Sequence, residues 1–343
     1  MGITHLQGLE INGVPTQGMG GAPFFTGNWF FIDPVHGSDG NTGSADNPIA
    51  SLYQAQNLMT AGNNDVAVIV GSGSTAATVR LSLANAQLIN PAATAGTLLW
   101  AKNACHIVGM TAPTRVSQRA RIAPPTGVYT GTTFGSATFV DVTAQGCYFG
   151  NFSLFNGFST GVAAQICWKD EGGRNYYQNV DFGGMGDAVS AQDTGSRSLL
   201  ITGSTGENTF DGCNIGLDTV TRTVANASLE FAAGTPRNLF RDCSFPFNTS
   251  AATVLGIITS AAASMDRYQE FDRCSFINSI KSASTQMTAL ATLAASSGGL
   301  LLMKNCTMVG ISDFGTDATS KGLIYVDGAA PTAATSGIAV NPS

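Results

Sequence analysis

Four aspartates recur in the later part of the 343-residue chain, each beside the same short repeated phrase: Asp181, Asp211, Asp242 and Asp272. Pairs of carboxyl groups perform acid and base catalysis on polysaccharides, so these residues are the first candidates for chemistry. Only Asp211 and Asp272 hold the same place in the phrase, and two repeats separate them, about 10 Å in a stack of strands. That spacing slightly exceeds the range of an inverting pair, and no histidine follows His106. We therefore expect no catalytic site and no enzymatic activity.

Other chemistry is also disfavoured by composition. The seven cysteines include no CxxC and the chain has only three histidines, so neither a zinc cluster nor another cofactor is expected. A net charge of −6 argues against a nucleic-acid partner. The sequence contains no window of about 18 apolar residues, so no membrane span is predicted. Residues 1–5 do not begin a signal peptide, so synthesis in a host cytoplasm is expected.

The repeated phrase reads apolar–x–x–Cys–x–apolar, as in Phe240-Arg241-Asp242-Cys243-Ser244-Phe245. Six residues are assigned to its fourth position, at steps of 33, 33, 30, 31 and 32: Cys147, Val180, Cys213, Cys243, Cys274 and Cys306. Such even spacing indicates a repeat architecture.

The end of each phrase alternates with period two, which is typical of a strand: Cys243 and Phe245 share one face, and Ser244 has the other. A second short apolar segment precedes each phrase, with turn residues between the two. Units of this size cannot close a core alone and must stack. The predicted fold is all-β, a single-stranded right-handed parallel β-helix with coils of about 30–33 residues. The cysteine positions are expected to form an inward ladder of reduced thiols; leucine-rich repeats lack support because no regular leucine pattern occurs.

Three segments are predicted. Residues 1–27 form a glycine-rich arm whose apolar side chains are candidates for docking on a partner: Leu6, Leu9, Ile11, Val14, Phe24 and Phe25. Residues 28–327 form the β-helix, with a short helix at 48–59 that covers its open end. Residues 328–343 form a second extended arm.

One part of the chain resembles a known family in the order of its segments. Trp29 to Asp33, Gly37 to Gly43, the helix after Pro48 and the apolar run Asp65 to Val70 resemble the opening of pectate-lyase-like β-helix proteins, above all those in tailed-phage virions. The resemblance implies a homotrimeric decoration or cement protein on the virion head surface, bound to the major capsid protein. The alternative is a tailspike or tail-fibre module that binds, or cleaves, host surface polysaccharide; Asp211 and Asp272 would then be the glycan site.

Overall fold

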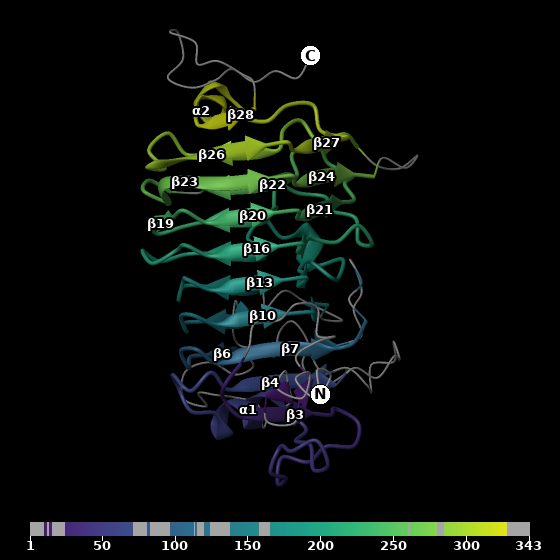
Figure 1. The fold of residues 1–343 in the computed structure, drawn as a ribbon. Helices are drawn as coiled ribbons and strands as arrows, with labels where there is room; N and C mark the ends of the chain where they lie inside the picture. The colour runs from purple at the N-terminus through teal and green to yellow at the C-terminus, as the bar shows by residue number, and fades with distance from the viewer. Residues whose placement is uncertain are drawn as a thin grey trace, which may run out of the picture.

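The computed structural model is a parallel β-helix, which confirms the predicted fold class (Figure 1). Its coils rise from the N-terminal strands, drawn in purple, to the C-terminal strands, drawn in yellow. The structure describes residues 10–11, 14–15, 25–70, 81–82, 97–112, 114, 120–123, 138–157, 165–259, 261–279 and 285–327. No helix among them is long and apolar enough to cross a membrane.

Each complete coil contributes one strand to each of three parallel sheets, which we call A, B and C. Sheet A contains β3 (Trp29–Ile32), β4 (Val66–Val70), β7 (His106–Met110), β10 (Tyr148–Gly150), β13 (Tyr176–Gln178), β16 (Thr209–Asp211), β20 (Leu239–Arg241), β23 (Met265–Asp272), β26 (Gly299–Lys304) and β28 (Ile324–Val326), with β19 (Thr235–Pro236) beside β23. Sheet B contains β5 (Leu81–Ser82), β8 (Arg121–Ala123), β11 (Ser153–Phe155), β14 (Asp181–Gly183), β17 (Asn214–Ile215), β21 (Ser244–Phe247), β24 (Ser275–Asn278) and β27 (Thr307–Val309). Sheet C contains β6 (Leu98–Trp100), β9 (Thr138–Val142), β12 (Ile166–Asp170), β15 (Arg197–Ile201), β18 (Ala227–Phe231), β22 (Leu255–Thr259) and β25 (Ala291–Leu293).

The repeated phrase spans the corner between sheets A and B. From β10 to β27, a residue with left-handed backbone turns the chain at each described corner: Asn151, Asn179, Gly212, Asp242, Arg273 and Asn305. Glycine, asparagine and aspartate tolerate this conformation best, which accounts for most of the residue types found there. The side chain after the corner enters the core: Phe152, Val180, Cys213, Cys243, Cys274 and, half-buried, Cys306.

Cys147 does not belong to this column, so its assignment to the phrase was wrong. Tyr148 pairs with Tyr176, which places Cys147 before its sheet A strand rather than after it. The residue in register with Val180 is Phe152, because Ser153 pairs with Asp181. Cys147 instead lies at the turn into sheet A, where its backbone N–H donates to Asn175 Oδ1 over 2.8 Å.

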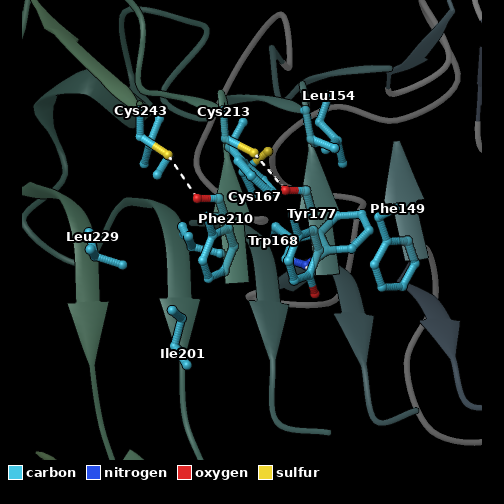
Figure 2. Packing of buried hydrophobic residues seen from close by; sticks show 14 of the residues in the cluster. Phe149, Leu154, Cys167, Trp168, Tyr177, Ile201, Phe210, Cys213, Leu229 and Cys243 are labelled. Atoms are coloured by element: carbon cyan, nitrogen blue, oxygen red, sulfur yellow. Dashed lines mark hydrogen bonds between the residues drawn. The ribbon is translucent and has the colours of Figure 1, made fainter. Parts of the chain in front are cut away.

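Parallel aromatic rings fill the core behind sheet A (Figure 2). The rings of Phe149, Tyr177, Phe210, Phe240 and Phe271 lie in successive coils, with centroids 4.9, 4.6, 4.6 and 4.7 Å apart. These separations follow the spacing of about 4.8 Å between paired strands, so correct register places each ring against the next. Beside them, the Cys213 thiol donates to the Tyr177 carbonyl and the Cys243 thiol to the Phe210 carbonyl.

A second internal ladder, absent from the sequence prediction, consists of amides at the turn into sheet A. Asn208 Oδ1 accepts from the Asn175 backbone N–H, and Asn238 Oδ1 accepts from the Asn208 N–H. Gln269 Oε1 accepts from the Asn238 N–H in the next coil. Each side chain therefore satisfies a buried backbone donor of the neighbouring coil.

Helices lie at both ends of the column (Figure 1). The predicted helix at 48–59 is shorter in the structure: α1 spans Leu52–Leu58, and Ser51 caps it by accepting from the Gln54 N–H. Pro48 lies outside the helix, and its carbonyl accepts from the Ser38 N–H. A second short helix, α2 (Ala318–Gly322), packs near β25 and β28 and was not expected from the sequence. The remaining regular elements of the described residues are a 3-10 turn (Ser190–Gln192) and an antiparallel hairpin of β1 (Glu10–Ile11) and β2 (Val14–Pro15).

The thiol column generates a testable prediction. Cys243→Ser should lower the free energy of unfolding by about 1–3 kcal/mol, because a more polar hydroxyl would replace a fully buried thiol. Urea unfolding measures the change, with Cys306→Ser as the matched control at the half-exposed end of the same column. Burial also raises the pKa of the Cys243 thiol, so it should resist alkylation in the native protein. Rapid native alkylation of Cys243, or equal stability of both variants, would contradict the packing described.

Candidate functional site

Asp211 and Asp272 lie in one column on the outer face of sheet A, two coils apart as expected. Arg241 stands between them, because it pairs in register with both Asp211 and Asp272. Its guanidinium lies 2.5 Å from Asp211 Oδ2, and Tyr176 donates to the same carboxylate over 2.7 Å. Asp272 in turn lies 2.7 Å from Arg273. The intervening arginine makes this column a row of alternating charges rather than a pair of facing acids.

The electrostatics of Asp211 do not favour acid catalysis. Partial burial would raise its pKa, but hydrogen bonds from Arg241 and Tyr176 outweigh burial and lower the pKa below its ordinary value. A carboxylate held ionised in this way cannot donate a proton near neutral pH. The structure thus gives the two residues an ion-pairing role on the sheet surface.

A different carboxyl pair lies on the outer face of sheet C. Asp141 on β9 is in register with Lys169 on β12, and Glu171 follows that strand directly. Lys169 Nζ lies 3.4 Å from Asp141 Oδ2 and 2.8 Å from Glu171 Oε1. The two carboxyl groups therefore contact the same ammonium group. We call these three residues the sheet C cluster.

Asp141 has the properties of a proton donor. Burial raises its pKa to about 6, the neighbouring Glu171 carboxyl adds to this rise, and Lys169 opposes it. Its Oδ1 atom is buried and has no hydrogen-bond partner among the described residues. For Lys169, burial would lower the pKa, but the contacts with Glu171 and Asp141 outweigh it and raise the pKa, so the ammonium stays charged. Perturbed carboxyl groups of this kind concentrate at functional sites.

The sequence prediction missed the sheet C cluster because it considered only aspartates near the repeated phrase. Asp141 and Lys169 belong to the apolar segments that precede the phrase, where each is a charged residue on the outward face of a buried strand. They are 28 residues apart, which is the length of one coil. This interval is the signal in the sequence that could have linked the two residues. Their pairing becomes evident only from the strand register.

The residues expected to dock a partner are only partly described. Leu6, Leu9 and Phe24 lie outside the described residues, whereas Ile11 and Val14 lie in the β1–β2 hairpin. Phe25 is buried against the chain's own sheet A: its ring stacks on His106 at 4.4 Å and lies 5.5 Å from Tyr148. Phe25 is therefore not free to contact a partner, and its assignment to the docking set was wrong.

No family model and no curated protein match this chain. Among solved structures, it is similar to a pectin methylesterase in complex with a hexasaccharide, at 13% identity and a TM-score of 0.53, over 91% of this chain and 92% of that one. It is also similar to pectin methylesterase PemA from Erwinia chrysanthemi (13% identity, TM-score 0.46, 91% and 92% covered) and to a rhamnogalacturonan lyase (11%, 0.36, 82% and 68%). At these identities the likeness establishes the fold alone, a parallel β-helix.

These comparisons correct one expectation. The chain was expected not to be an enzyme, yet solved structures that resemble it in fold are pectin methylesterases. The expectation rested on the spacing of Asp211 and Asp272 and on the lack of a histidine after His106, and it overlooked the sheet C cluster. The phage part of the resemblance is not tested by these comparisons.

The raised pKa of Asp141 predicts a pH-dependent stability change. Well below pH 4 the carboxyl group is protonated in both the folded and unfolded states and does not change the free energy of unfolding. Well above pH 6 it is ionised in both states, and the folded state carries the desolvation penalty. Asp141→Asn should therefore raise the free energy of unfolding by about 1–2 kcal/mol at pH 8 and by little at pH 4, the full shift being reduced by partial solvation. Thermal unfolding at both pH values measures this, with the exposed Asp266→Asn as control. Equal effects at the two pH values would contradict the raised pKa.

Proposed function

We propose that this chain is a carbohydrate-active β-helix protein that binds polysaccharide along sheet C and hydrolyses an ester substituent on it. This develops the glycan-binding alternative and moves its site from Asp211 and Asp272 to the sheet C cluster. The observation that carries it is that Asp141 and Glu171 both contact Lys169, and that the pKa of Asp141 is raised.

The two carboxyl groups can act as the base and the acid of ester hydrolysis. Glu171 accepts a proton from water as the water oxygen attacks the ester carbonyl, and Asp141 donates its proton to the leaving oxygen as the C–O bond breaks. Lys169 stabilises the negative charge that develops on the carbonyl oxygen. A proton then passes from Glu171 to Asp141 through water, and this transfer restores the starting state.

We choose an ester rather than a glycosidic bond as the substrate because of the solved structures that have a similar fold. The pectin methylesterases among them have ester substrates by name, which supports this choice.

Activity on esterified polysaccharides tests the proposal. Methyl-esterified pectin and O-acetylated bacterial surface polysaccharides are supplied as substrates, and acid release is followed in a pH-stat. Asp141→Asn should reduce the rate by about 10²–10⁴-fold, since a positioned acid contributes that much. Asp266→Asn is the matched control and should keep the wild-type rate. Wild-type protein that releases no acid from any substrate, or Asp141→Asn at the wild-type rate, would refute the proposal.

The capsid-decoration role stays a separate prediction, carried by the resemblance of residues 29–70 to phage virion proteins. Deleting residues 1–24, which leaves Phe25 in its place on sheet A, should abolish co-sedimentation with phage heads that lack the protein. The Phe25→Ala variant of the full chain is the control for damage to sheet A and should still bind heads. Binding that survives the deletion would exclude docking by the arm.

A further inference from the structure

A hollow of about 150 Å³ lies on the outer face of sheet B, on a different sheet from the sheet C cluster. One of its walls is polar and crosses four adjacent strands in register: Arg121 on β8, Ser153 on β11, Asp181 on β14 and Asn214 on β17. Successive members are about 4.8 Å apart along the column, the spacing of paired strands. The volume has room for several water molecules.

Hydrogen bonds within the row fix how its polar atoms are presented. The Ser153 hydroxyl donates to Asp181 Oδ2 over 2.8 Å, and Asn214 Nδ2 donates to Asp181 Oδ1 over 2.7 Å. Asn214 is 2% exposed, and its Oδ1 atom has no hydrogen-bond donor among the described residues. Because Ser153 and Asn214 use their donors on Asp181, the oxygens that remain are acceptors. A ligand that matches them brings several O–H donors.

The lining of the hollow also includes three apolar side chains: Phe155, Leu217 and Pro246. Two glycines leave room between these walls, since Gly183 and Gly216 follow the paired residues Phe182 and Ile215. A side chain on Gly216 would bring its first carbon to 2.9 Å from the Pro246 carbonyl oxygen. A pyranose ring matches such a lining, because it carries hydroxyl groups around its edge and apolar C–H groups on its faces.

We propose that this hollow binds a neutral saccharide unit, with its hydroxyl groups on Ser153, Asp181 and Asn214 and its C–H face against Phe155 and Leu217. Asp181 and Asp218 outnumber Arg121 among the charged residues of the lining, so an anionic sugar is disfavoured. This site is separate from the proposed esterase centre and needs no reaction there.

Saturation-transfer NMR and calorimetry with methyl glycosides of glucose, galactose and rhamnose, beside the methyl glycoside of galacturonic acid, test the site. At least one neutral glycoside should bind saturably and more tightly than the galacturonide. Leu217→Trp fills the hollow from its rim without removing a polar group and should weaken binding at least tenfold. Val309→Trp, an exposed position higher on sheet B, is the matched control and should bind as the wild type does.

Three outcomes would overturn the proposal: no saturable binding of a neutral glycoside, preference for the galacturonide, or wild-type affinity in Leu217→Trp. Circular dichroism of both tryptophan variants shows that loss of binding is not loss of fold. Asp141→Asn should bind the glycoside unchanged, whereas Leu217→Trp should retain acid release from small esters. Failure of this site is thus distinguishable from failure of the proposed esterase activity.

Discussion

In-register stacking of coils is the constraint on which the rest of the structure depends. Hydrogen bonding between parallel strands sets one repeat distance, and side chains at equivalent positions must then contact each other at that distance. Aromatic rings can stack at this distance, as they do from Phe149 to Phe271. Amide side chains can bond at this distance to a backbone N–H of the neighbouring coil, as at Asn208. The outer faces obey the same rule: like charges in adjacent coils would repel, so Arg241 separates Asp211 from Asp272.

The fold class was predictable because the constraint leaves a periodic trace in the sequence. The steps of 30 to 33 residues from Val180 to Cys306 identified the corner between sheets A and B. The same pattern failed at Cys147, because a cysteine with phenylalanine two residues later occurs both at that corner and at the turn into sheet A. Only backbone pairing distinguishes the two turns. The true step there is 28 residues, from Phe152 to Val180, and no cysteine marks it.

The candidate site was less predictable because its chemistry depends on neighbours in space. Asp141 and Lys169 are ordinary surface residues when each is read within its own segment. The raised pKa arises from burial and from Glu171, whose distance from Asp141 depends on how two coils stack. The hollow on sheet B has the same origin: Ser153, Asp181 and Asn214 come from three coils, and Gly183 and Gly216 are informative only once their strands are known to be neighbours.

The loop that follows β3 has a consequence for assembly. Its backbone pairs with β3, since the Phe31 N–H donates to the Gly43 carbonyl and the Phe31 carbonyl accepts from the Ile49 N–H. Asp39 fixes this loop to the start of α1 by accepting from Ala50 and Ser51. An open first strand would offer its donors and acceptors to the last coil of another molecule, and a parallel β-helix could then lengthen end to end without limit. The turn-forming residues of this loop therefore occupy the donor and acceptor of Phe31 that such end-to-end growth would need.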